Sequence, residues 1–166
     1  MLINLNQNKN LKLFKIISEV ASRNGQTVYA VGGFVRDLIM KRKVPTDIDF
    51  VTESSGIELA ESIAREIDPK TKVAVFKTYG TAMFKYKDLE LEFVGARKES
   101  YSEDSRKPSV EIGTIEDDQK RRDFTINAMA ISLNKENFGE LIDPFDGLQD
   151  LKKKILRTPL EPHQTY

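Results

Sequence analysis

The chain has 166 residues, of which 39% are hydrophobic and 31% are charged, and its 26 basic side chains balance its 26 acidic ones. This length suits one domain with a modest core, and zero net charge argues against a free-standing protein that binds nucleic acid by charge alone. No cysteine is present, which excludes disulfides and thiolate metal sites. The one histidine, His163, excludes histidine clusters and makes a histidine-dependent catalytic triad unexpected.

No stretch of the sequence resembles a targeting or membrane segment. The opening residues, MLINLNQNKN, lack a basic region followed by an apolar core. No apolar run approaches the roughly 18 residues that a membrane span needs. We therefore expect a soluble, cytoplasmic protein with no membrane partner.

Helical and strand-like segments alternate in the first half of the chain. Asn24 and Gly25 are a C-terminal cap for the first helix, and Ser54 or Ser55 can cap the third at its start. The expected elements are a helix over 10–23, a strand over 27–31, a helix over 34–40, a strand over 47–51 and a helix over 55–67.

The second half opens with three strand-like runs, at 72–76, 81–86 and 89–94, and Lys87-Asp88 joins the last two as a hairpin. Residues 98–119 are polar and are expected to form a long loop of functional or mobile character. A helix is expected over 121–133, and 140–151 supplies a short strand, turns and the start of another helix. The mixture predicts an α+β fold whose mixed, largely antiparallel sheet packs against helices.

Two aspartates interrupt the apolar strand VPTDIDFVTE, although acidic residues are depleted in strands. Asp47 and Asp49 share one strand face, while Ile48 and Phe50 point to the other. Two carboxylates held side by side repel each other unless a cation lies between them, and Mg²⁺ is the hard cation that oxygen ligands favour. The alternative is a solvent-facing pair without a ligand.

A strand runs into two glycines and then a helix in VYAVGGFVRD. Gly32 and Gly33 let a ligand approach the backbone, and the helix start that follows suits a phosphate. Arg36 could bind the same anion, or it could form a structural ion pair with Asp37 or Asp47. The spacing matches neither a dinucleotide-binding fingerprint nor a P-loop.

A third carboxylate is expected from a neighbouring strand. In LELEFVGAR, Glu90 and Glu92 share a face, and alternation alone does not choose between them. Further on, KRRDFTINAMA places basic residues at the start of the expected helix, against its macrodipole, which indicates an anionic ligand. Asp123 and Asn127 lie four residues apart on one polar face of that helix. The alternative is a solvated basic patch.

Four motifs, VGGFVRDLIMKRKVPTDIDFV, LEFVGARKESY, RRDFTINAMA and DPFDGLQDLKKKILRT, occur in this order. Together they closely resemble the catalytic head of class II template-independent RNA nucleotidyltransferases, the CCA-adding enzymes of tRNA and the bacterial poly(A) polymerases. The resemblance covers residues 28–158. It implies a polymerase-β-like nucleotidyltransferase fold and a two-metal transfer of NMP from CTP or ATP to the 3′-hydroxyl of tRNA or another RNA.

The resemblance also assigns roles to residues. Asp47 and Asp49 would coordinate Mg²⁺, and Glu92, five residues before Arg97, would be the third catalytic carboxylate. The nucleotide-binding residues would be Gly32, Gly33, Arg36, Arg122, Asp123 and Asn127.

The resemblance divides the chain into an N-terminal helix of the head over 1–26, the catalytic head over 27–151 and the start of a truncated neck over 152–166. The family's base-reading Glu-Asp-x-x-Arg motif and helical body do not occur in the sequence, so we expect an incomplete product in which base choice is undecided. Three alternatives stay open: a poly(A) polymerase head, a non-catalytic nucleotide-binding module of the same fold, and a small-molecule nucleotidyltransferase, which would not need RRDFTINAMA.

Overall fold

The computed structural model describes residues 1–42, 46–100 and 109–159. The strands are β1 (Tyr29–Val31), β2 (Asp47–Thr52), β3 (Ala74–Phe76), β4 (Thr81–Tyr86), β5 (Leu89–Gly95), β6 (Arg97–Ser100), β7 (Ser109–Ile112), β8 (Ala130–Ser132) and β9 (Leu141–Ile142). The helices are α1 (Leu11–Arg23), α2 (Gly33–Ile39), α3 (Gly56–Ile67), α4 (Ile115–Lys120) and α5 (Gly147–Lys152), with 3-10 turns η1 (Lys77–Tyr79), η2 (Thr125–Asn127) and η3 (Lys135–Asn137).

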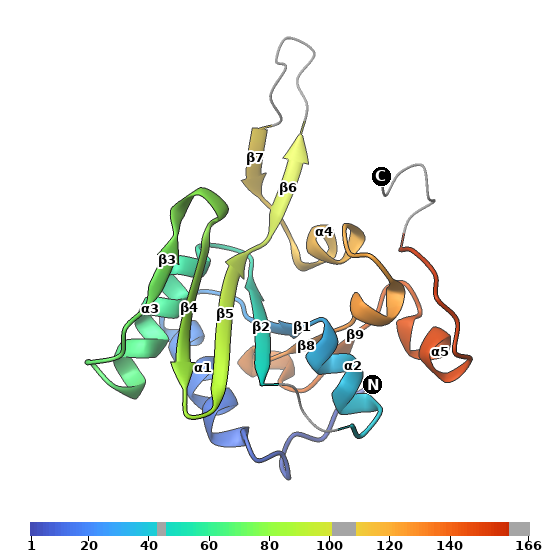
Figure 1. Ribbon diagram of the computed structural model, residues 1–166, viewed down its shortest axis with the longest axis horizontal. Helices are drawn as coiled ribbons and strands as arrows, with labels where there is room; N and C mark the ends of the chain where they lie inside the picture. Colours follow the sequence, from blue (N-terminus) through green and yellow to red (C-terminus); the bar gives the residue numbers. More distant parts are fainter. Residues whose placement is uncertain (43–45, 101–108, 160–166) are drawn as a thin grey trace.

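Seven of these strands form one sheet in the order β3-β4-β5-β2-β1-β8-β9 (Figure 1). β2 and β5 are parallel, and all other neighbours in the sheet are antiparallel. β6 and β7 form a separate antiparallel hairpin that projects beyond the sheet. The expected α+β class with a mixed, largely antiparallel sheet is confirmed.

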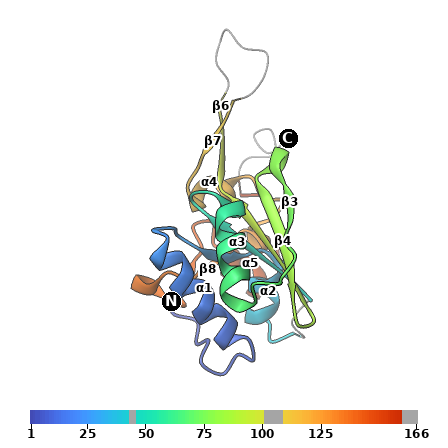
Figure 2. The same ribbon diagram turned by 90° about the vertical axis from the view of Figure 1, so that its left-hand side faces the viewer.

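Helices α1 and α3 cover one face of the sheet (Figure 2). Their apolar faces pack against alternate residues of the strands, and α2 adds Phe34 and Val35 to the same core. On the opposite face, Ile115 of α4 packs with Tyr29, Val31 and Val51 in a smaller cluster. Asp47 and Asp49, at the start of β2, lie on this face and stay exposed, whereas Ile48 between them is buried in the main core.

Three phenylalanines join the central strands on the core side. The rings of Phe50 and Phe93 are stacked with centroids 4.8 Å apart, and those of Phe84 and Phe93 are 5.7 Å apart. Phe50 and Phe93 are also direct partners in the parallel register of β2 and β5. A slip of one residue would turn these rings to the opposite face, so their burial specifies the register.

The helices expected over 10–23, 34–40 and 55–67 are confirmed as α1, α2 and α3. Gly25 follows α1 with φ of +66°, the left-handed conformation that favours glycine. The Ser55 hydroxyl accepts a hydrogen bond from the Glu58 amide at the start of α3, which identifies Ser55 as the cap. The expected strands and the Lys87-Asp88 hairpin are also confirmed.

The helix expected over 121–133 is wrong. This segment forms the turn η2 and the strand β8, which pairs with β1 on one side and β9 on the other. Ile131 faces the main core and Ala130 the smaller one, so alternation replaces helical spacing. Pairing with two distant strands outweighs local propensity. Arg121 and Arg122 therefore follow the C-terminus of α4, where the conflict with a helix macrodipole does not arise.

The prediction of a long loop over 98–119 is also wrong for the residues that the structure describes. These residues form the strands β6 and β7 and the helix α4. The remainder, 101–108, lies outside the described residues, as does Pro45. The domain limits at 26/27 and 151/152 stay predictions, and 160–166 of the expected neck are likewise undescribed. Among the described residues, no helix combines the length and the apolarity that a membrane crossing requires.

The phenylalanine stack gives the first prediction. Phe93 is fully buried, so Phe93→Ala removes both ring contacts and leaves a cavity. We expect the free energy of unfolding to fall by about 3–5 kcal/mol, measured by urea denaturation. Lys85→Ala, an exposed change on the other face of the sheet, is the control and should have little effect. Equal losses for the two variants would contradict the assignment of register to the stack.

Candidate active site

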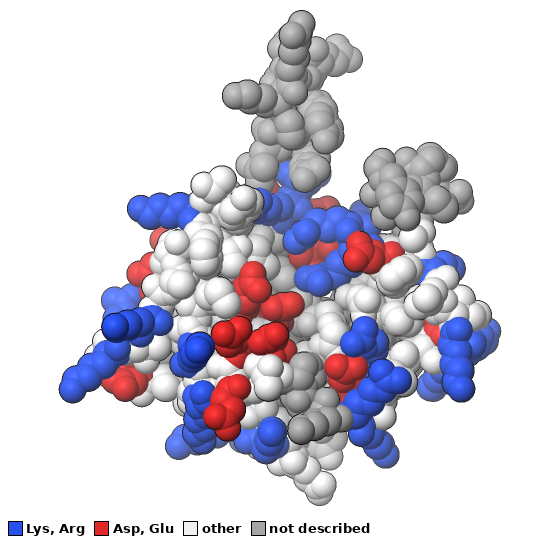
Figure 3. Space-filling view, viewed as in Figure 1, with Lys and Arg blue, Asp and Glu red and all other residues white. Residues whose placement is uncertain are grey.

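The parallel register of β2 and β5 places four acidic residues on one face of the sheet. Asp47 lies opposite Glu90, and Asp49 lies opposite Glu92. Figure 3 shows acidic side chains gathered over these strands, beside a basic group in the direction of α4. The shared face that the sequence predicted is therefore confirmed.

Asp49 and Glu92 interact directly. Desolvation by the surrounding chain raises the pKa of the Asp49 carboxyl, although the positive charge of Arg122 opposes this shift. Desolvation also raises the pKa of Glu92, and the negative charge of Asp49 raises it further. Both carboxyls are therefore harder to ionise than free side chains.

Asp47 is exposed on the same face, near enough for its negative charge to raise both of these pKa values. Among the residues that the structure describes, however, no three acidic or histidine side chains are arranged to hold a metal ion by themselves. Mg²⁺ in nucleotide sites commonly takes one or two carboxylates and completes its shell with phosphate and water. The Asp49–Glu92 pair fits that donor set, since a cation would relieve its repulsion.

The two glycines form the tight turn that the sequence predicted. Gly32 adopts φ of 75° and ψ of −140°, which favours glycine. A Cβ atom on Gly32 would lie 3.4 Å from Nη1 of Arg122, and one on Gly33 would lie 3.5 Å from Nη2 of Arg36. The guanidinium groups of Arg122 and Arg36 therefore lie directly beside the glycine turn.

Arg36 is held in place by two hydrogen bonds. Its Nε donates to Oδ1 of Asp37 at 3.1 Å, and its Nη1 donates to Oδ1 of Asn127 at 2.9 Å. The ion pair with Asp37 is one of the structural partners expected for this arginine, and no contact with Asp47 is formed among the described ion pairs. Arg36 and Asn127 thus position each other at one side of the glycine turn.

A buried carboxylate that the sequence analysis missed holds the two other arginines. Asp118 of α4 is fully buried, and its two oxygens accept hydrogen bonds from Nη2 of Arg121 and from Nε of Arg122, each at 2.9 Å. The available signal was the i, i+3 and i, i+4 spacing between an acid near the end of α4 and the two bases that follow the helix. Since each bond uses one nitrogen, both guanidiniums keep donors for a ligand.

α4 itself is tied to the sheet at both ends. Thr114 and Asp117 form a reciprocal capping box at its start, and the Ile115 amide donates to Oε2 of Glu53 at 3.0 Å. At its end, the buried Gln119 amide donates to the carbonyls of Ala128 and Ile142. These bonds fix where the following arginines lie relative to β2.

Residues of the DPFDGLQDL motif contact the segment that carries Asn127 and hold it in place. The Thr125 hydroxyl donates to Asp150 of α5, and this bond, with the charge of Arg157, holds the pKa of Asp150 below its ordinary value. Gly147 lies so close to the Thr125 carbonyl that a Cβ atom would collide with it. The motif therefore supports the site without entering it.

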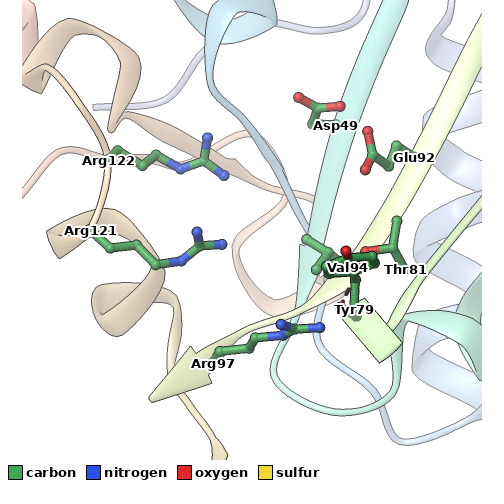
Figure 4. A pocket seen from close by; sticks show the side chains of 8 residues that line it. All are labelled: Asp49, Tyr79, Thr81, Glu92, Val94, Arg97, Arg121 and Arg122. Atoms are coloured by element: carbon green, nitrogen blue, oxygen red, sulfur yellow. Dashed lines mark hydrogen bonds between the residues drawn. The ribbon is translucent and has the colours of Figure 1, made fainter. Parts of the chain in front are cut away.

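Two cavities meet at Asp49. The first, which we call the glycine cavity, has a volume of about 410 Å³ and is lined by Gly32, Gly33, Arg36, Asp49, Arg121, Arg122, Asp123 and Asn127. The second, the tyrosine cavity of about 330 Å³, is lined by Asp49, Tyr79, Thr81, Glu92, Val94, Arg97, Arg121 and Arg122 (Figure 4).

The glycine cavity brings together all six residues that the resemblance assigns to nucleotide binding, together with Asp49. Glu92 lines only the tyrosine cavity, and Asp47 lines neither. Tyr79 belongs to the turn η1 and was missed, because no pattern in the sequence places that turn beside β5. Carboxylates that face arginines next to a glycine turn are a combination that suits a phosphorylated ligand with a cation.

Comparison with known proteins agrees with that class. Residues 28–157 match the poly(A) polymerase head domain family, and the chain belongs to this family. Membership implies the use of a divalent metal ion in general terms.

An A-adding tRNA nucleotidyltransferase of Aquifex aeolicus is 49% identical over 129 residues, which are 78% of this chain and 15% of that protein. A CCA-adding enzyme solved as apo form II is 39% identical, with a TM-score of 0.80 over 93% of this chain and 36% of that one. A tRNA nucleotidyltransferase solved with a primer tRNA and an incoming ATP analogue is 42% identical, with a TM-score of 0.74 over 87% of this chain and 39% of that one. The chain thus spans well under half the length of each.

The raised carboxyl pKa values predict how stability depends on pH. Because Glu92 binds its proton more tightly in the folded chain, stability falls as pH rises from the ordinary value of 4.5 to the raised pKa. Glu92→Gln removes the negative charge of this carboxylate. We therefore expect the variant to have a higher free energy of unfolding than the wild type at neutral pH, and the difference between the two proteins to become smaller at acidic pH. Urea denaturation across pH measures it.

Glu61→Gln, an exposed change on α3, is the control and should alter stability little at any pH. A Glu92→Gln variant that is less stable than wild type at neutral pH would show that the carboxyl pair is not a source of repulsion.

Proposed function

We propose that the chain is the catalytic head of a tRNA nucleotidyltransferase, most simply a CCA-adding enzyme, that transfers NMP from CTP or ATP to an RNA 3′-hydroxyl and releases pyrophosphate. The single observation that carries this proposal is the meeting of the Asp49–Glu92 pair with the glycine cavity, which combines a metal donor set with anion-binding groups. Family membership and the names of the relatives support it.

The residues would divide the work as follows. The triphosphate would lie in the glycine cavity, where Arg36 and Arg122 neutralise its charge and Asn127 keeps Arg36 in position. Asp49 and Glu92, with Asp47 beside them, would hold Mg²⁺ together with the phosphate oxygens. When bound, the metal lowers the pKa of the attacking hydroxyl and stabilises the charge of the leaving pyrophosphate. No side chain has to act as a covalent nucleophile.

A second function, addition of the terminal A alone, is favoured by the 49% identity to an enzyme named as A-adding. The described head residues do not separate it from CCA addition or from poly(A) synthesis. In a polymerase assay with CTP and ATP, we expect a tRNA lacking CCA to gain no more than three nucleotides. Extension only of a tRNA that ends in CC would favour the A-adding function, and long A-tails would contradict both.

Metal-dependent nucleotide binding separates an enzyme from a non-catalytic module. We expect the chain to bind ATP or CTP in the presence of Mg²⁺, and Asp49→Ala and Glu92→Ala to abolish that dependence, as measured by calorimetry. Glu90→Ala is the matched control, because Glu90 shares the strand and the face of Glu92 but lines neither cavity. Nucleotide binding that ignores both Mg²⁺ and Asp49→Ala would contradict the proposed catalytic role.

A further inference from the structure

Asp118 is a buried charge that the fold alone does not explain. Its carboxylate is fully buried, where it loses the hydration that stabilises a negative charge. Ion pairs buried in this way are often no more stabilising than apolar side chains of similar volume. The role of Asp118 therefore has to be sought in the groups that it contacts.

These contacts fix both arginines that follow the helix α4. Oδ1 of Asp118 accepts a hydrogen bond from Nη2 of Arg121, and Oδ2 accepts one from Nε of Arg122. Because a guanidinium group is planar and rigid, the bond at Nε also determines where the two Nη atoms of Arg122 point. Nη1 lies beside the glycine turn, 3.4 Å from the place that a Cβ atom of Gly32 would take. Asp118 therefore directs the free donors of Arg122 into the glycine cavity.

The two arginines face the carboxylate pair from the opposite wall. In Figure 4 their side chains extend from the α4 side toward Asp49 and Glu92. Only 21% of the Arg122 side chain is exposed, against 52% for Arg121, so Arg122 is the more restrained of the two. Among the ion pairs of the described residues, Asp118 is the only acid that is bonded to either arginine. Loss of its carboxylate would free both side chains.

The charge of Asp118 has the wrong sign to attract a phosphate directly. Desolvation is the main cause of the raised pKa of Asp49, and the negative charge of Asp118 adds to it, so this charge is felt in the site. If Asp118 acted only through its charge, its loss would tighten the binding of a phosphorylated ligand. If it acts by holding the arginines, its loss would weaken that binding. The two effects differ in sign, so one substitution distinguishes them.

We propose that Asp118 is a positioning residue for the triphosphate, which holds Arg122, and less tightly Arg121, as fixed donors of the glycine cavity. This proposal rests on the function proposed above and adds a residue that touches neither the substrate nor the metal. A donor that is already in place does not have to be ordered when the ligand binds, which saves the entropy of a long side chain. This gain outweighs the repulsion between Asp118 and the phosphates.

The test measures by calorimetry the affinity of the chain for ATP with Mg²⁺ and, separately, for inorganic tripolyphosphate. We expect Asp118→Asn to weaken the binding of both ligands roughly tenfold, because the amide keeps the shape of the carboxylate but turns a donor toward one guanidinium group. Glu116→Gln is the matched control, since Glu116 is an exposed acid on the same helix. Its loss of one negative charge should leave binding unchanged or slightly tighter.

A double-mutant cycle with Arg122→Gln separates positioning from a general loss of structure. In the Arg122→Gln background, Asp118→Asn should weaken binding by no more than about threefold, the share that remains for Arg121. A general loss of structure would weaken binding by the same factor in both backgrounds. Arg122→Lys is a further variant that leaves the buried carboxylate in place. Lysine keeps the charge but lacks the Nε that Asp118 holds, so a loss of roughly tenfold is expected here too.

Unchanged or tighter binding in Asp118→Asn would overturn the positioning role, as would equal factors in the two backgrounds. If Asp118→Asn does not fold, Arg122→Lys decides: the expected loss would support the role, and unchanged affinity would overturn it. A chain that binds tripolyphosphate in this Asp118-dependent way, but shows no Mg²⁺-dependent binding of ATP, would contradict the proposed function and leave the positioning role standing. A wild-type chain that binds neither ligand would overturn both.

Discussion

The parallel pairing of β2 with β5 is the constraint on which the rest of the site depends. On the buried side, Phe50 stacks on Phe93, and this contact specifies the register. On the exposed side, the same register sets Asp49 opposite Glu92. Because strand side chains alternate between faces, the packing of the two rings in the core also determines how far apart the two carboxylates lie. Neither strand alone would hold the pair.

The site concentrates charge that the fold does not neutralise internally. Asp49 and Glu92 repel each other and hold their protons more tightly than usual, whereas Asp118 satisfies only part of the hydrogen-bonding capacity of Arg121 and Arg122. Direct pairing of these acids and bases would stabilise the chain but close the site. Keeping them apart costs stability and leaves both groups open to a phosphate that arrives with a cation, a trade-off common in active sites.

Local patterns predicted the parts of the site that lie within single elements. The alternation in DIDFV and LELEFV predicted that the carboxylates share one face of the sheet, and the paired glycines predicted a tight turn. The helix predicted over 121–133 was wrong, although Phe124, Ile126, Met129 and Ala130 have helical spacing. The conformation of this segment depends on the pairing of β8 with β1 and β9, which are remote in sequence. Burial of Asp118 and the placement of Tyr79 beside β5 are likewise tertiary, so no local pattern revealed them.

If the carboxylate pair takes up a metal ion together with a nucleotide, protons are released on binding, and their number is the most direct measure of this event. Calorimetric titration of ATP with Mg²⁺, at a pH between the ordinary carboxyl pKa and neutrality and in buffers of different ionisation enthalpy, gives that number. We expect weak binding of Mg²⁺ alone, much tighter binding of the two ligands together, and release of protons from the Asp49 and Glu92 carboxyls, whose pKa values are raised in the free chain. Tight binding of Mg²⁺ without nucleotide, or joint binding that releases no proton, would contradict it.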